Sequence, residues 1–558
     1  MKKAIIILIA FFFMNTCIVF PQGIGINNGG SAPDPSAILD VKSTTQGMLV
    51  PRMTAAQAFA ISSPAEGLLI YATDAQSFLY YKTGTWNYLT SEFAYEITDF
   101  DFDTRITTGN GLDPDDDIIR FFIRNAETFM IDSNRIVPLT DNILIGKNAG
   151  TSFTTGQSNI AIGNGTLYSN TITSDLVAIG DSALYHNTAI YNTAIGSKSL
   201  YSNTTGHQNT VIGFHALYSN TIGQGNTVNG SEAMYSNTLG SSNTASGDAA
   251  LYNNITGNAN TANGYVALYN NTEGNGLTAN GYNALSGNTT GNTNTANGFY
   301  ALVNNTTGND NTAIGSGALF NNTTGHSNVA LGVSAARLGQ TASNVVAIGD
   351  SALFNNLASG NVAVGSKAMY SNTTGDHNTA NGVEALYFNT SGVNNTANGW
   401  GVLHQNNGSD NTANGGMALL FNTSGNQNTA SGAYSLTNNT TGYENTGIGY
   451  CNLYSNFNGL RNTAIGAAAL YSNNNGNYNT ATGSLALFAN YNGLYNTGIG
   501  QQSLYSNTNG NANTAVGQNA LYANTLGSDN TAVGYLSLNT SSTGHKNTAI
   551  GSNALLNN

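Results

Sequence analysis

A glycine recurs at a nearly constant interval through most of this 558-residue chain. There are 25 such glycines from Gly146 to Gly551, each closing a variant of Asn-Thr-Ala-Ile-Gly, and their spacing is 17 residues except for three intervals of 16. A unit this short cannot bury a hydrophobic core alone, so neighbouring copies must stack on one another. The repeat therefore predicts an all-β protein, a repetitive β-solenoid or β-roll of about 25 coils with a 17-residue period.

Three other positions recur with the glycine, which we take as position 0 of each copy. Asparagine occupies position −4 in 22 of 25 copies and position +7 in 22, while leucine occupies position +4 in 21. Because asparagine and glycine favour turns, each coil is expected to hold two short strands with turns between them. The leucines should stack as a buried core ladder. Its members include Leu167, Leu184, Leu217, Leu251 and Leu268.

Positions −3 and −1 flank a small residue at position −2 and should share one face of the coil. Position −1 is aliphatic in 15 copies and polar in 10, and the polar copies cluster in runs. An unpaired polar group in a dry core costs about 1–3 kcal/mol, so this face is either wet or part of a self-associating surface with polar layers. Long aliphatic blocks left in water are unusual, which favours self-association.

Composition excludes several classes of function. Charged residues make up 8% of the chain, the net charge is −13 and no basic cluster occurs, so nucleic-acid binding is not expected. No Ser-His-Asp or Cys-His arrangement, phosphate loop or zinc spacing is present. The protein is therefore predicted not to be an enzyme.

The chain divides into four segments by composition. Residues 1–21 are typical of a secretory signal, with Lys2 and Lys3 before an apolar run. Residues 22–90 are expected to form a non-repetitive β-rich head, 91–141 a β-hairpin connector and 142–558 the repeat array. We therefore expect an exported protein at the cell surface, at the outer membrane or outside the cell. Because the sequence stops inside a copy, we also expect it to be a fragment.

One cluster of carboxylates suggests a metal site. Asp99, Asp101 and Asp103 alternate along a predicted strand, which would place them on one face. Carboxylate oxygens are ligands that calcium prefers. A solvated strand face explains the same pattern, so both interpretations stand, and no other cofactor is indicated.

Position +5, next to the core leucine, is aromatic in 16 copies. On a strand it would point outward, where a ladder of rings could grip a partner or stack against sugars. The rings could equally pack between protomers or over their own coil. The first run consists of Tyr168, Tyr185, Tyr201, Tyr218, Tyr235, Tyr252 and Tyr269.

Some copies resemble the head repeats of a known adhesin family. Asn328-Val329-Ala330-Leu331-Gly332 and Asn361-Val362-Ala363-Val364-Gly365 are similar to the repeats of trimeric autotransporter adhesins, the YadA-like left-handed β-roll. The resemblance implies a trimer of parallel rolls at a bacterial outer membrane that binds matrix proteins or other cells. The 17-residue unit is longer than the family's usual period, threonine replaces valine in most copies, and no coiled-coil stalk or β-barrel anchor follows within this sequence.

The N-terminal segment carries a second resemblance. Ala37-Ile38-Leu39-Asp40-Val41, Pro51-Arg52-Met53-Thr54 and the stretch from Ser63 to Tyr71 are similar to the leading region of surface and fibre proteins in Bacteroidetes-type bacteria. Proteins of that group often end in the self-cleaving chaperone domain known from phage tail spikes, which trimerises the fibre. That domain is absent from this sequence.

The sequence thus predicts an exported cell-surface adhesin or fibre, a non-catalytic homotrimeric rod. Its partners would be a host or neighbouring-cell surface molecule, a matrix protein or a glycan. One alternative is a phage-type tail fibre lacking its C-terminal chaperone domain. Another is an ice-binding solenoid, because threonines stacked at position −3 would form a regular array of hydroxyls, although the bands at position −1 interrupt a flat uniform face.

Overall fold

The structure is a computed structural model of the chain. The chain forms two compact units, Met1–Leu139 and Thr140–Asn558. The predicted signal at 1–21 and Asp99, Asp101 and Asp103 lie outside the described residues. The described residues are 24–89, 96–98, 105–108, 119–123, 126–131, 136–138 and 141–557.

The first unit contains small sheets and, among its described residues, one short helix. The helix α2 (Ala55–Phe59) begins with a capping box, in which the Thr54 hydroxyl accepts from the Gln57 backbone N–H and the Gln57 side chain accepts from the Thr54 N–H. Ala58, Ile70 and Leu79 form most of a small buried core. In the described part of this unit the strands are β1 Ile24–Asn27 paired in parallel with β2 Leu39–Lys42, and a sheet in the order β3 Arg52–Met53, β4 Leu69–Ala72, β5 Ser77–Lys82 and β6 Thr85–Leu89.

Five further strands of this unit form an antiparallel sheet in the order β11-β10-β9-β8-β7. They are β7 Glu96–Thr98, β8 Arg105–Thr108, β9 Ile119–Ile123, β10 Ala126–Ile131 and β11 Ile136–Pro138.

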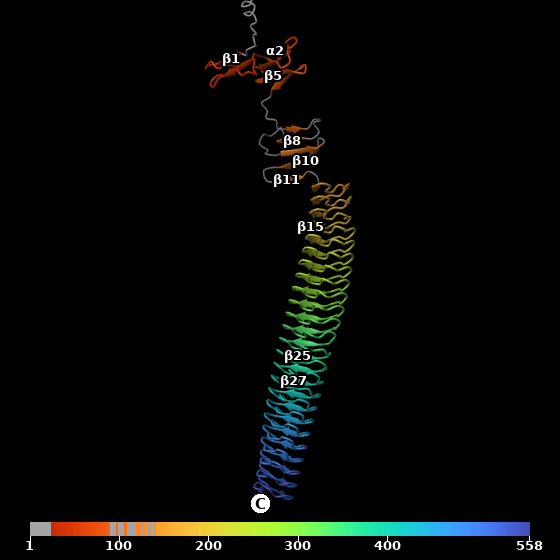
Figure 1. Cartoon of the computed structure of the whole chain (residues 1–558), viewed down its shortest axis with the longest axis vertical. Coiled ribbons are helices and arrows are strands. Elements are labelled where there is room, and N and C mark those ends of the chain that lie inside the picture. Colours follow the sequence, from red (N-terminus) through yellow and green to blue (C-terminus); the bar gives the residue numbers. More distant parts are fainter. Residues whose placement is uncertain are drawn as a thin grey trace, which may run out of the picture. The chain divides into compact units, whose positions relative to one another are not determined.

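The second unit is a stack of coils whose strands form one parallel sheet of 25 strands, in chain order from β12 to β36 (Figure 1). The strands pair in register, so that Thr261, Ala262 and Asn263 lie beside their counterparts in the next coil. This confirms the predicted all-β solenoid with its 17-residue period. The strands are β12 Asn142–Ile145, β13 Asn159–Ile162, β14 Val177–Ile179, β15 Thr193–Ile195, β16 Thr210–Ile212, β17 Thr227–Asn229, β18 Thr244–Ser246, β19 Thr261–Asn263, β20 Thr278–Asn280, β21 Thr295–Asn297, β22 Thr312–Ile314, β23 Val329–Leu331, β24 Val346–Ile348, β25 Val362–Val364, β26 Thr379–Asn381, β27 Thr396–Asn398, β28 Thr412–Asn414, β29 Thr429–Ser431, β30 Thr446–Ile448, β31 Thr463–Ile465, β32 Thr480–Thr482, β33 Thr497–Ile499, β34 Thr514–Val516, β35 Thr531–Val533 and β36 Thr548–Ile550.

Each described coil contains one strand, and the expectation of two strands per coil was wrong. Positions +2 and +4 adopt left-handed backbone, as at Val266 (φ 49°) and Leu268 (φ 54°), which interrupts an extended segment. The turns are nevertheless bonded from coil to coil: the Leu268 N–H donates to the Ala284 carbonyl at 3.0 Å. Backbone pairing therefore continues around the coil without a second strand.

The core of the rod is narrow and continuous. Small residues at positions −2 and +3, such as Ala262 and Ala267, are fully buried beside the leucine at +4. Leu167, Leu184, Leu217, Leu251 and Leu268 are all 0% exposed. The alternation of small and large side chains lets consecutive coils approach closely enough to share one hydrophobic core.

The motif glycine is required by both its conformation and its surroundings. Gly264 has φ +137°, and a Cβ atom added to it would lie 2.5 Å from the Gly281 carbonyl oxygen in the next coil. The left-handed half of the map is accessible to glycine without steric penalty. The 17-residue signature therefore marks a corner where the backbones of successive coils pass in close contact.

Candidate interaction surfaces of the rod

The two recurrent asparagines lie inside the rod and do not form a binding surface. At position +7, the Asn237 side-chain N–H₂ donates to Asn220 Oδ1 at 2.8 Å and to the Gly240 carbonyl at 3.0 Å. At position −4, Asn226 Nδ2 donates to Asn209 Oδ1 at 3.0 Å, and so does its backbone N–H. Away from the two ends of the rod both sets are buried, and the bonds satisfy amide groups that would otherwise be costly to bury.

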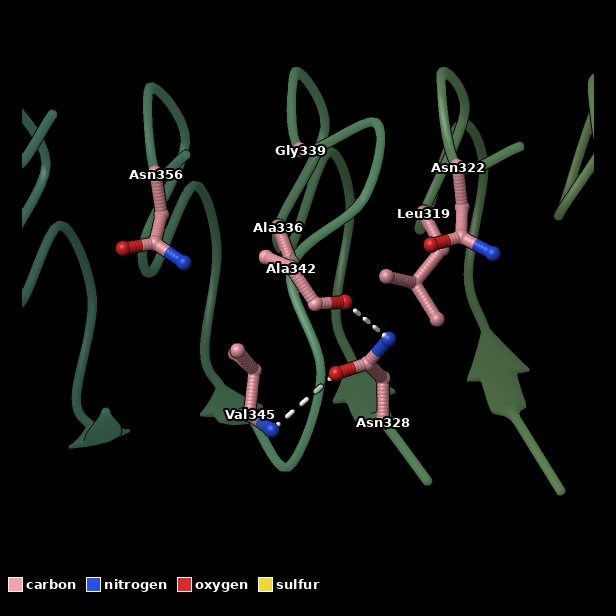
Figure 2. Close-up of a pocket in the computed structure, with 8 residues that line it drawn as sticks. All are labelled: Leu319, Asn322, Asn328, Ala336, Gly339, Ala342, Val345 and Asn356. Atoms are coloured by element: carbon pink, nitrogen blue, oxygen red, sulfur yellow. Dashed lines mark hydrogen bonds between the residues drawn. The ribbon is translucent and has the colours of Figure 1, made fainter. Parts of the chain in front are cut away.

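The ladder at position +7 is interrupted where the asparagine is replaced, and each interruption leaves one amide atom without a partner. Gly339 lies between Asn322 and Asn356 in consecutive coils (Figure 2). Asn322 Oδ1 is buried with no hydrogen-bond donor, because glycine offers none at that level. Phe153 and Ser541 occupy position +7 next to the other two orphaned ladder atoms, Asn170 Nδ2 and Asn524 Oδ1.

The coil that follows Gly332 departs from the pattern at four positions. Ala336 replaces the core leucine, Gly339 and Val345 replace the two asparagines, and Ala342 replaces the turn glycine. A cavity of about 10 Å³ lies among these residues, at the lower limit of the space that one water needs. Asn328 still donates to the Ala342 carbonyl and accepts from the Val345 N–H (Figure 2). This coil is a local packing defect within an intact backbone stack.

Positions −3 and −1 form the outward face of the 25-stranded sheet, while position −2 points into the core. In β16, for example, the residues at −3 and −1 are exposed and Val211 is buried. At position −1, Ile212, Leu331 and Ile448 are 43%, 44% and 43% exposed. The outward face therefore presents aliphatic side chains to solvent in bands separated by the polar runs.

The polar runs on this face carry their own hydrogen bonds. Asn263 Nδ2 donates to Asn280 Oδ1 at 2.8 Å, and Asn398 Nδ2 donates to Asn414 Oδ1 at 2.8 Å. These bonds run along the rod between neighbouring coils. The outward face thus alternates between aliphatic bands and bands of asparagine and serine.

The aromatic residues at position +5 stack on one another along the rod. Ring centroids of consecutive members are 4.8–5.2 Å apart with planes within 21° of parallel. Partial burial raises the pKa of Tyr252 above its ordinary value, and Glu232 and the neighbouring phenols act in the same direction. This first run consists of Tyr168, Tyr185, Tyr201, Tyr218, Tyr235, Tyr252 and Tyr269.

Two further aromatic runs follow after interruptions. Phe354, Tyr370, Tyr387 and His404 stack in sequence, and a longer run extends from Tyr454 to Tyr522. The interior rings have each face covered by a neighbouring ring, so edges and phenolic hydroxyls are the parts presented outward. A sugar could approach a hydroxyl, whereas stacking on a ring face is possible at the end of a run. A role for the tyrosines in partner binding stays a prediction.

Within the residues that the structure describes, no group of three or more His, Cys, Asp or Glu side chains is placed to hold a metal ion. The predicted calcium site falls outside those residues. No helix in the described part of the chain has both the length and the apolar character needed to cross a membrane.

Comparison with known proteins finds a similarity in the N-terminal part of the chain. Residues 23–107 match a protein-family model described as a phage tail like trimerisation region. No curated protein and no solved structure matches the chain.

The family match supports a homotrimer. Together with the solenoid rod, it suggests a fibre-like structural protein and gives no support to catalysis. The likeness of the repeats to trimeric autotransporter adhesins stays a prediction.

Proposed function

We propose that this chain forms an exported trimeric attachment fibre. Its N-terminal region would join three copies, and its repeat array would serve as a long, non-catalytic rod that binds molecules on a cell, a matrix or another surface. The observation that carries the proposal is the presence in one chain of a trimerisation-region match and a continuous stack of 25 coils. At about 4.8 Å per coil the stack is about 120 Å long, which suits projection from a surface.

The trimeric state is tested by the mass in solution of residues 22–558, measured by light scattering. A mass of three chains is expected at micromolar concentration, and it should persist at high salt because the chain has few charged residues. A monomer would contradict the fibre as proposed. A dimer would contradict the trimeric arrangement.

Attachment is tested separately from assembly. The purified trimer is applied to surfaces coated with matrix protein, with glycans or with whole bacterial or animal cells, and to surfaces blocked with albumin as the control. Saturable retention on one coated surface supports the adhesin. A trimer retained no better than on albumin would contradict attachment and leave a purely structural fibre.

A phage-type tail fibre is the second candidate, favoured by the description of the matching family. Fractionation of the producing cells separates the two functions. The adhesin predicts that the protein sediments with the cell envelope, and the tail fibre predicts that it sediments with phage-like particles.

The same sheet favours ice binding less strongly than attachment. The threonines at position −3 stack in register, as at Thr261 and Thr278, but Val329, Val346 and Val362 interrupt the hydroxyl array. We expect no thermal hysteresis from the purified protein, and a measurable hysteresis would revive this alternative.

A further inference from the structure

Aliphatic and polar bands alternate at position −1 along the outward face of the sheet. The bands extend over all 25 coils, and their residue type changes several times along the rod. We propose that the alternation of aliphatic and polar bands at position −1 sets the register in which the rods of three copies pair. Each aliphatic band would then meet the same band of its neighbours, and each polar band would meet a polar band. This inference rests on the proposed trimeric fibre.

The bands follow the rod in a fixed order. Five aliphatic coils end at Ile212, five polar coils end at Asn297, four aliphatic coils end at Val364 and four polar coils end at Ser431. The last seven coils, from Ile448 to Ile550, are aliphatic except for Thr482.

Two patches within this face are aliphatic at both outward positions. Position −3 is isoleucine or valine in the first three coils and again at Val329, Val346 and Val362, whereas the other coils carry threonine there. In the second patch Val329 is 39% exposed and Leu331 is 44% exposed. Adjacent exposed aliphatic residues on consecutive strands form a contiguous apolar surface, which marks a contact site.

The polar bands supply the specificity of the contact. Asn263 and Asn280 are hydrogen-bonded along their own rod, so their amides can enter an interface with part of their bonding already satisfied. An asparagine layer placed against an aliphatic band would lose water without gaining a partner. Polar layers within an apolar interface specify register in coiled coils for the same reason.

The band pattern matches itself best when equivalent coils lie side by side. With no displacement, all 25 coils face a residue of the same kind. A displacement of five coils would place an aliphatic residue opposite a polar one at 15 of the 20 coils that still overlap. Three-fold rotational symmetry puts equivalent residues at equal heights along the three rods. In this arrangement each band faces a band of its own kind.

The occupant of this face is therefore a second copy of the same chain. The trimerisation-region match at residues 23–107 supplies an independent reason for three copies to associate in the same direction. A different partner would have to reproduce the band order over the whole length of the rod.

The test uses thiol cross-linking of the full chain with Cys17 and Cys451 replaced by serine. The reporter variants are Asn229→Cys and Ile314→Cys, which lie on the outward face five coils apart. Five coils span about 24 Å, so a much shorter bifunctional reagent distinguishes the two registers. Thr205→Cys, exposed on a turn, is the matched control.

In-register pairing predicts efficient cross-links between two copies that both carry Asn229→Cys. In mixed trimers of the two variants, cross-links that join Asn229→Cys of one chain to Ile314→Cys of another should form at least tenfold less. The Thr205→Cys control should also stay low. A trimer by light scattering that cross-links equally in both registers, or best through Thr205→Cys, would overturn the inference while leaving the trimeric fibre intact. A monomer would overturn both.

A second variant tests whether the polar band itself is the cause. Replacing Ser246, Asn263, Asn280 and Asn297 with isoleucine should raise the displaced cross-link to within about twofold of the in-register one. Replacing the same four residues with threonine should leave the ratio unchanged. Unchanged ratios in the isoleucine variant, with the trimer retained, would show that the bands do not set the register.

Discussion

The coils around Leu268 and the coil that follows Gly332 share one backbone arrangement but fill it differently. The coil that contains Leu268 has a leucine in the core and Asn271 in the ladder at position +7, whereas the irregular coil has Ala336 and Gly339 at those positions. Both coils lack the asparagine at position −4, which is Leu277 in one and Val345 in the other. The Ala336 N–H nevertheless donates to the Ala352 carbonyl at 2.9 Å, as Leu268 does to Ala284. The backbone bonds between coils therefore carry the stack across a level where the side-chain signature is lost.

The two kinds of coil also differ in the hydrogen bonds and the packing that their side chains contribute. In the coils around Leu268 the amides of the +7 ladder have partners, while the irregular coil leaves Asn322 Oδ1 unpaired and encloses a cavity. Because each coil contacts only its neighbours, a local loss stays local in a stack of this kind. Amide hydrogen exchange or proteolysis at named coils measures such a local loss, whereas a single free energy of unfolding does not describe a long repeat array.

The largest effect is expected from a side chain at the motif glycine of a regular coil. Gly264→Val would place Cβ 2.5 Å from a backbone oxygen in a left-handed conformation, with a local loss of about 4 kcal/mol or more. Limited proteolysis should reveal a new cleavage region there. Gly416→Ala is the control, because no atom lies within 4 Å of its added Cβ. Equal resistance of the two variants would contradict the close-contact role of the glycine.

Substitutions at the leucine position should change local stability in opposite directions in the two regions. Leu268→Ala removes a fully buried side chain and is expected to cost about 2–5 kcal/mol locally. Ala336→Leu restores the usual residue beside the cavity and should cost nothing or gain up to about 1 kcal/mol. Hydrogen exchange of the flanking amides measures both. A strong loss in Ala336→Leu would mean that the irregular coil has repacked around its small residue.

Replacing an asparagine of the +7 ladder should cost more local stability where the ladder is complete than where it is interrupted. Asn237→Ala removes three hydrogen bonds, two donated and one accepted from Asn254, with an expected local cost of about 2–3 kcal/mol. Asn322→Ala removes two, because its Oδ1 already lacks a partner. Exchange protection should therefore fall further for Asn237→Ala. The reverse order would show that the ladder bonds do not contribute individually.

A smaller effect is expected for the aromatic ladder. Tyr218→Ser imitates the native interruption at Ser286 and removes two stacked contacts of a half-exposed ring, with an expected cost of about 1 kcal/mol. Tyr218→Phe should be neutral, because Phe488 occupies the same position in a stacked run. If the serine variant instead abolishes trimer formation while its coils stay protected, the rings lie between protomers.

The smallest effect concerns pH. His404 ends the second aromatic run, stacked on Tyr387 at 5.2 Å, and burial holds its pKa below the ordinary 6.5, although Glu384 acts in the opposite direction. The folded chain therefore binds this proton less readily than the unfolded chain. The stabilisation is present above pH 6.5 and is lost as the pH falls towards the lower folded pKa. Exchange protection near His404 should decline over that interval, and His404→Tyr should remove the decline.

Much of the fold follows directly from the spacing of a few residues. The glycine interval predicted the stacked coils, and the alternation of Thr261, Ala262 and Asn263 predicted which residue of each strand faces inward. Neither argument needs the tertiary structure, because a side-chain period of two and a constant repeat length leave few other ways to bury the leucines.

The turn side of the coil could not be predicted in the same way. Asn and Gly indicated turns, but leucine has no preference for the left-handed conformation that Leu268 adopts. That conformation becomes favourable when the neighbouring coil accepts its N–H and the core covers its side chain. The tyrosine ladder is a similar case: residue type indicated an exposed ring, while the contact of one ring with the next depends on the spacing between coils.

The sequence by itself thus determined a β-solenoid, its coil length, its buried leucines and the banded outward face, because all of these depend on periodicity and polarity. The tertiary structure alone decided that each coil has a single strand, that the +5 rings cover one another, and that the coil after Gly332 keeps its backbone bonds around a cavity. These features arise from contacts between successive coils, whose geometry no single copy of the repeat contains.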